Sequence, residues 1–235
     1  MKIGVISDIG LMRNKNEDNY LINQEQGLFI VCDGMGGHKG GEVASQIAID
    51  VIDKYFQGNQ DENQVTMLNK AIELANRVIW TKGKEHPQLY EMGTTITAAF
   101  LDNDQLTVAN VGDSSLYIIR NDNIRKVTRD HTLAQQMVSD GLLPHEEVRA
   151  STYNHVLTRA LGVEEEVIID NFTEEILPGD FVMICSDGLS DMLDENEILS
   201  IIQTDKEVDS ITCELLDQAL QKGGHDNITV ILMRL

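Results

Sequence analysis

Residues 27–38 read Gly-Leu-Phe-Ile-Val-Cys-Asp-Gly-Met-Gly-Gly-His, an apolar run that stops at an aspartate and a glycine-rich turn. Five successive apolar residues between a glycine and an aspartate are typical of a strand buried on both faces. The predicted turn, Gly34 to Gly41, leads into a helix. The apolar face of that helix is expected to comprise Val43, Ala44, Ile47, Ala48, Val51, Ile52 and Tyr55.

The segments on either side of this stretch extend the pattern. Strands are predicted at 3–7, 94–101, 106–111, 116–120, 124–127, 181–186 and 228–234, and helices at 65–79, 195–202 and about 208–219. Strict strand–helix–strand alternation is missing, which argues against a doubly wound parallel sheet. Strands distant in the sequence must pair, and the helices come in hairpins. We therefore expect an α+β sandwich of sheets covered by helix pairs.

The whole chain, residues 1–235, is predicted to be a single domain, because no repeat, low-complexity tract or linker divides it. Its three cysteines form neither a disulfide framework nor a Cys-x-x-Cys pair. The formal charge of −21 disfavours binding to nucleic acid or to an anionic membrane. Neither a signal peptide nor a membrane-spanning run is visible. We therefore expect a cytoplasmic protein with no stable membrane insertion.

Aspartates recur at the ends of the predicted strands, and these are Asp18, Asp33, Asp113, Asp187 and Asp226. Asp-Gly and Asp-Asn pairs are common turn formers, so each one alone indicates a turn more often than a ligand. Five together, next to buried strands, favour a cluster of carboxylates that cations must neutralise. Carboxylate oxygens are the ligands that Mg²⁺ and Mn²⁺ prefer. A site for divalent cations among these aspartates is therefore predicted.

Arg13 lies beside the first of these acidic segments, Asn16-Glu17-Asp18. A guanidinium group can form bidentate hydrogen bonds to a phosphate group. It can equally form a structural ion pair with Glu17 or Asp18. The sequence leaves both roles open.

Eight motifs, taken in order, resemble bacterial metal-dependent serine/threonine protein phosphatases of the type-2C (PPM) class. They are Arg13-x-x-Asn16-Glu17-Asp18, Asp33-Gly34-Met35-Gly36-Gly37-His38, Gly93-Thr94-Thr95, Asn110-Val111-Gly112-Asp113-Ser114, Thr128-x-Asp130-His131, Leu157-Thr158-Arg159-Ala160-Leu161-Gly162, Ser186-Asp187-Gly188-Leu189 and Asp226-Asn227-Ile228-Thr229-Val230. The resemblance spans about residues 6–230. It implies a four-layer αββα sandwich, in which helix pairs flank two antiparallel sheets.

The resemblance also implies a binuclear Mn²⁺ or Mg²⁺ centre and a weaker third ion. Asp33 would bridge the two metals, the Gly34 carbonyl would bind one, and Asp187 and Asp226 would hold the other. Asp113 with Asp187 would supply the third ion, while Glu17 and Asp18 would act through water or behind the direct ligands. Arg13 would bind the substrate phosphate, and residues 131–162 would form a flap beside the active site.

The implied activity is hydrolysis of phosphoserine and phosphothreonine in proteins by metal-activated water. Met35 stands where some relatives carry a histidine that is a candidate general acid, and His38 has no role that transfers. The expected partners are phosphorylated proteins, including a Ser/Thr kinase and its substrates, and the expected state is a monomer. Two alternatives are a catalytically silent binding module, and a branch that dephosphorylates a sigma-factor regulator.

Overall fold

The computed structural model describes residues 1–36, 40–58 and 63–235. Gly37 and His38, the last two residues of the second motif, lie outside the described residues. Two five-stranded antiparallel sheets dominate the fold, and a small sheet pairs β4 (Gly34–Met35) with β5 (Gly93–Thr94). The first sheet has the order β1 (Lys2–Asp8), β12 (Ile228–Arg234), β11 (Phe181–Cys185), β8 (Ser115–Arg120), β9 (Asn123–Lys126). The second has the order β10 (Asp170–Glu175), β7 (Gln105–Val111), β6 (Ile96–Asp102), β3 (Leu28–Cys32), β2 (Asn19–Asn23).

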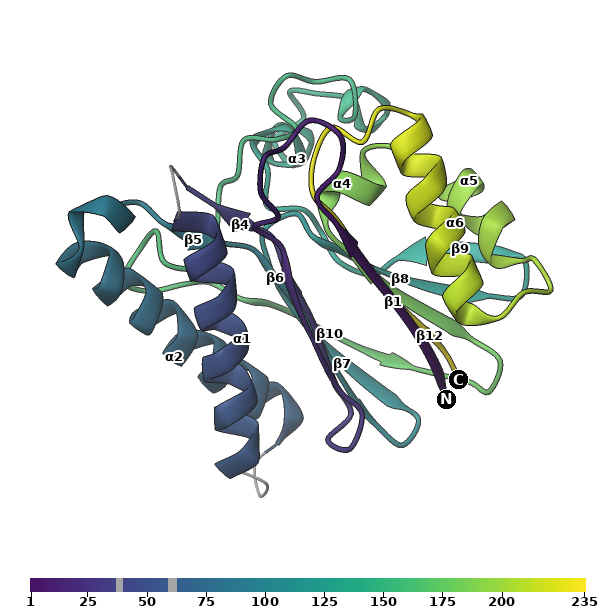
Figure 1. The fold of residues 1–235 in the computed structure, drawn as a ribbon, viewed down its shortest axis with the longest axis horizontal. Helices are drawn as coiled ribbons and strands as arrows, with labels where there is room; N and C mark the ends of the chain where they lie inside the picture. Colours follow the sequence, from purple (N-terminus) through teal and green to yellow (C-terminus); the bar gives the residue numbers. More distant parts are fainter. Residues whose placement is uncertain (37–39, 59–62) are drawn as a thin grey trace.

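Helices cover both outer faces of the sandwich (Figure 1). Helices α1 (Gly40–Gly58) and α2 (Gln64–Glu85) pack on the second sheet, and α5 (Glu195–Ile202) and α6 (Val208–Gln221) pack on the first. The short helix α4 (Asp187–Ser190) follows β11, and α3 (Leu133–Ser139) lies in the predicted flap. Single turns of 3₁₀ helix occupy Pro87–Leu89 and His145–Glu147. The four-layer αββα prediction is confirmed.

Three apolar clusters hold these layers together. One lies between α1, α2 and the second sheet, one between the two sheets, and one between the first sheet and α5 and α6. Phe29 and Val31 of β3 face the other sheet, whereas Leu28, Ile30 and Cys32 face the helices. Because side chains alternate along a strand, β3 is apolar on both faces. The prediction of a strand buried on both faces is confirmed.

Some element boundaries differ from those predicted. The predicted turn at 34–41 contains the short strand β4, and α1 begins within it at Gly40. The structure also adds Ile49 and Phe56 to the buried face of α1 and leaves Val43 only half-buried. Helix α2 continues to Glu85, six residues beyond the predicted end at 79.

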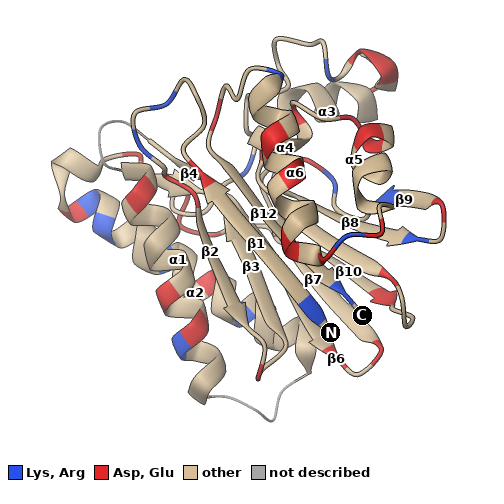
Figure 2. Cartoon of the chain, turned by 45° about the vertical axis from the view of Figure 1, so that its right-hand side comes forward, with Lys and Arg blue, Asp and Glu red and all other residues tan. Residues whose placement is uncertain are grey.

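Acidic residues are distributed over the helices and loops of the described chain and exceed the basic ones (Figure 2). Among the helices within the described ranges, none combines the length and the apolar character needed to cross a bilayer.

Candidate metal centre

One cleft of about 830 Å³ brings together seven of the eight predicted site residues, and these are Arg13, Glu17, Asp33, Gly34, Asp113, Asp187 and Asp226. Strand β4, helix α4 and the loop after β1 lie at the same end of the sandwich (Figure 1). The eighth residue, Asp18, is buried and does not line the cleft. Strand ends from both sheets thus converge at this cleft.

The backbone of Asp33 is fixed on both sides by two threonines. Its N–H donates to Thr95 Oγ1 at 2.9 Å. Its carbonyl accepts from the Thr94 hydroxyl at 2.9 Å and from the Thr95 N–H at 2.8 Å. These bonds hold the chain rigid where it leaves β3, so the Asp33 carboxylate has a defined direction into the cleft.

Gly34 sits where no larger residue fits. A Cβ atom at this position would lie 2.3 Å from the Gly41 carbonyl oxygen and 2.5 Å from that of Glu17. Both are backbone atoms, so neither can move aside without shifting its segment. The close approach of three backbone segments explains the glycine on steric grounds, and the cleft lining includes Gly34.

Asp187 and Asp18 meet through Ser186, which lies between β11 and α4. The Ser186 hydroxyl donates to Asp18 Oδ2 at 2.7 Å. The other oxygen of Asp18 and Oδ1 of Asp187 are buried without a hydrogen-bond partner. An unpartnered buried carboxylate oxygen is costly, so Asp187, which lines the cleft, has an oxygen available to a cation.

Asn227 joins the two ends of the described chain at the cleft. Its side-chain amide donates to the carbonyls of Ile9 at 2.9 Å and Lys15 at 2.8 Å, and its Oδ1 accepts from the Glu17 N–H at 2.8 Å. These three bonds fix the loop that carries Arg13 and Glu17 against the start of β12. Asn227 belongs to the last of the eight motifs, for which the sequence predicted no role at this position.

Arg13 forms its ion pair with Asp226, not with Glu17 or Asp18 as one of the two predicted alternatives had it. The register of β1 against β12 explains the difference, because it places Asp8 opposite Ile228 and so brings the following loop alongside Asp226. The Arg13 side chain is 52% exposed and lines the cleft. Its guanidinium therefore stands at the wall of the acidic cleft.

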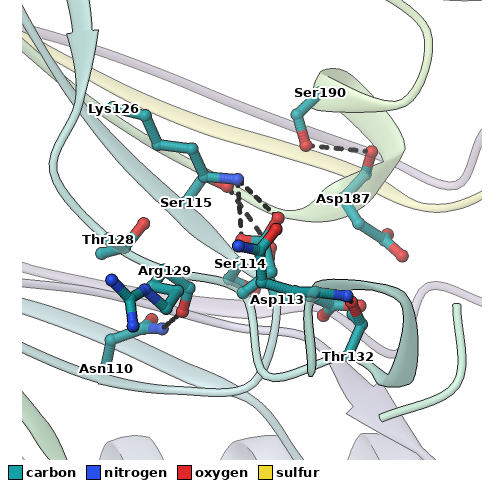
Figure 3. Close-up of polar contacts among 12 residues, drawn as sticks. Asn110, Asp113, Ser114, Ser115, Lys126, Thr128, Arg129, Thr132, Asp187 and Ser190 are labelled. Atoms are coloured by element: carbon teal, nitrogen blue, oxygen red, sulfur yellow. Dashed lines mark hydrogen bonds and ion pairs between the residues drawn. The ribbon is translucent and has the colours of Figure 1, made fainter. Parts of the chain in front are cut away.

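Asp113 lies in the tight connection between β7 and β8 (Figure 3). The preceding Gly112 has a φ of 105°, and its N–H donates to His131 Nδ1 at 3.1 Å. The other ring nitrogen of His131 lies 3.2 Å from Asp170 Oδ2. Burial lowers the pKa of His131, so a neutral ring with its proton on Nε2 satisfies both contacts. This network holds the backbone that carries Asp113.

The carboxylates of the cleft perturb one another strongly. Burial raises the pKa of Asp33 and Asp187 well above the ordinary value, and neighbouring aspartates raise both further. For the same first reason the pKa of Asp18 is raised to about 6 and that of Asp113 to about 7. Clustered carboxylates of this kind need either protons or cations. An all-oxygen donor set with unpartnered buried atoms fits hard divalent ions such as Mn²⁺ and Mg²⁺.

The flap is attached to the cleft through Asp191, which the sequence reasoning missed. The Asp191 carbonyl accepts from Arg149 at 2.7 Å, and its Oδ2 lies 3.2 Å from His155 Nδ1. Ligand atoms of His155, Asp187 and Asp191 lie within 4.8 Å of one another. Asp191 directly follows the short helix α4, and a single aspartate there carries no signal of such a contact, because only the fold brings residues 149–155 to it.

Comparison with known proteins decides the family. The model of the family described as protein phosphatase 2C matches residues 6–137. The chain belongs to the protein phosphatase 2C family. It is 35% identical to the serine/threonine phosphatase Stp of Listeria innocua, over 97% of this chain and 93% of that protein.

Solved structures of protein phosphatase 2C relatives share the fold. The serine/threonine phosphatase PstP of Mycobacterium tuberculosis superposes with a TM-score of 0.92 at 33% identity, covering 98% of this chain and 97% of that one. Stp1 of Staphylococcus aureus gives 0.93 at 30% identity, covering 100% and 95%. The PstP catalytic domain in complex with two manganese ions gives 0.88 at 33% identity, covering 98% and 96%.

Proposed function

We propose that this protein hydrolyses phosphoserine and phosphothreonine in proteins at a centre of two divalent ions. The observation that carries the proposal is the convergence of Asp33, Asp187 and Asp226, with the Gly34 backbone, in one cleft. Two unpartnered buried carboxylate oxygens and strongly raised carboxyl pKa values support occupation by cations. The relatives named as serine/threonine phosphatases support the substrate class.

In the proposed assignment Asp33 would be shared by the two ions, the Gly34 carbonyl would help to hold one of them, and Asp187 and Asp226 would hold the other. When bound, the pair of ions would supply a water of lowered pKa near neutral pH. Glu17 lines the cleft and would act through water, and the buried Asp18 would act from behind the ligands. Asp113, together with Asp187, would hold a weaker third ion.

The chain's own residues would bind and orient the substrate. Arg13 presents a guanidinium at the wall of an acidic cleft, where it can form two hydrogen bonds to a phosphate dianion. Its pair with Asp226 holds the guanidinium at the cleft, and the positive charge of that group would stabilise charge on the phosphate oxygens. Met35 also lines the cleft, but its thioether has no proton to give to the leaving oxygen.

We further propose that residues 1–235 form one catalytic domain that acts as a monomer in the cytoplasm. Seven of the eight predicted site residues come together within one copy of the chain, so the proposed centre needs no residue from a second copy. Ser/Thr kinases draw ATP from the cytoplasm, which supports that location for an enzyme that opposes one. The phosphorylated kinase and its substrates would be the partners, and residues 131–162 would be the flap that helps to choose among them.

The test is release of phosphate from a phosphothreonine peptide and from a chromogenic aryl phosphate with Mn²⁺, with and without a chelator. We expect turnover that needs the metal and is lost in Asp33→Asn. Arg125→Gln, on the first sheet and paired with Glu174, is a matched control that should retain turnover. Binding of the peptide without release of phosphate would favour the silent binding module. Phosphoproteins that accumulate in a deletion strain and vanish when the kinase is also deleted would identify the substrates.

A further inference from the structure

Lys126 is a partly buried cation at the end of β9, in a pocket that shares Arg149, Asn154 and Asp191 with the metal cleft. Its Nζ lies 2.7 Å from both carboxylate oxygens of Asp130 and 5.9 Å from the centroid of the Tyr117 ring. The Lys126 side chain is 25% exposed. Figure 3 shows it extending toward the connection that carries Ser114 and Asp113.

The charge of Lys126 acts on Asp113 and Asp191, and Asp113 is the residue at which the third ion is proposed to bind. We call the region of Asp113, Asp130 and Asp191 the corner. Lys126 lowers the pKa of Asp113 and that of Asp191, whereas Asp130 raises both. Burial opposes the ammonium form, yet Asp130 and Tyr117 outweigh it, so the pKa of Lys126 is raised and the side chain is charged at neutral pH. The corner thus contains a fixed positive charge among the carboxylates of Asp113, Asp130 and Asp191.

The neighbouring cation on β9 does not share this position. Arg125 lies next to Lys126 in the strand, so its side chain points to the opposite face of the sheet. It forms a bidentate pair with Glu174 at 3.0 and 2.7 Å and is 50% exposed. Arg125 therefore provides a matched position where a charge can be removed from the same strand without touching the corner.

We propose that the positive charge of the Lys126 ammonium group weakens the binding of a third divalent ion at Asp113. The inference rests on the proposed metal centre, in which the two main ions bind at Asp33, Asp187 and Asp226. A cation near Asp113 repels a divalent ion and partly neutralises the carboxylates that would attract it. Lys126 would thereby keep the third site weak while leaving the two main sites almost unchanged, because its charge acts on the pKa of Asp113 and Asp191 and is not among the causes of the raised pKa of Asp33 or Asp187.

The test replaces Lys126 by Met, which is unbranched and one atom shorter and removes the charge. Mn²⁺ is titrated into the metal-free protein by calorimetry and by electron paramagnetic resonance of the free ion. We expect the weakest ion to bind about tenfold more tightly, from the loss of one nearby positive charge. Lys126→Arg and Arg125→Met should both bind all ions as the unaltered protein does, within about twofold.

Asp130→Asn makes the test independent of how Lys126→Met folds. Removing this carboxylate should weaken the third ion, and the double variant Lys126→Met/Asp130→Asn should return toward the affinity of the unaltered protein. Asp113→Asn should abolish binding of the weakest Mn²⁺ ion, and this loss would assign that binding step to the third site. An unchanged or weaker third ion in Lys126→Met, or no third ion in any variant, would overturn the proposal while the two main ions still bind. A protein that binds no Mn²⁺ at all would overturn the metal centre itself.

Discussion

Asp113→Asn should stabilise the metal-free protein at high pH and not at low pH. In the folded chain burial raises the pKa of Asp113 from 3.8 to about 7. A raised carboxyl pKa means that the folded state holds the proton more tightly than the unfolded state. Its contribution is therefore fully present below about pH 4 and is lost as pH rises through about 7. Each pH unit corresponds to about 1.4 kcal/mol, so the full loss is about 4 kcal/mol.

Urea denaturation in the presence of a chelator measures this effect. Asparagine does not ionise, so the difference in free energy of unfolding between Asp113→Asn and the unaltered protein should grow by about 3 kcal/mol from pH 5 to pH 8. Saturating Mn²⁺ should reduce or reverse the advantage of the variant at pH 8, because the carboxylate then gains a cation. A difference that stays the same at pH 5 and pH 8 would refute the reasoning.

Three further predictions concern the walls of the cleft. Arg13→Ala should raise KM for a phosphopeptide about tenfold or more, with a smaller fall in kcat, in steady-state kinetics with Mn²⁺. A fall confined to kcat would contradict the proposal that Arg13 binds the substrate phosphate. Gly34→Ala should lower the free energy of unfolding by more than about 2 kcal/mol, because its Cβ would lie 2.3 Å from a backbone oxygen, and thermal melting would detect it. Asp191→Ala removes the carboxylate that contacts His155 and Asn154, so limited proteolysis should cut faster between residues 145 and 157 while the rest of the chain stays protected. An unchanged cleavage rate would show that this carboxylate does not hold the flap.

The apolar pattern predicted most of the fold because the sheets are buried on both faces. Strand β12 matches its predicted range at 228–234, and the buried side of α6 contains the predicted Val208, Ile211 and Leu215. Strand β10 was missed. Its sequence, Asp-Asn-Phe-Thr-Glu-Glu, is mostly polar, as suits an edge strand. Its pairing with β7 holds it in the sheet, although its side chains carry little of the apolar signal that predicts a strand.

Residues of the site were predictable where an aspartate follows a strand, and not where a contact depends on the packing of distant segments. Asp33 and Asp187 carry the local signal of an apolar strand before them. Asn227 was quoted only as part of a motif, since its three bonds reach residues more than 200 positions away. Asp191 contacts a flap that lies about 40 residues earlier in the chain.

The antiparallel pairing of β1 with β12 has a consequence for biosynthesis. Asp226 and Asn227 lie just before β12, yet they fix the loop of residues 9–17, which is synthesised more than 200 residues earlier. A ribosome must therefore release residues 226–234 before the carboxylates can gather around an ion. The nascent polypeptide would stay unable to act on phosphoproteins until its last strand emerges, so premature termination would yield an inert product and not an unregulated one.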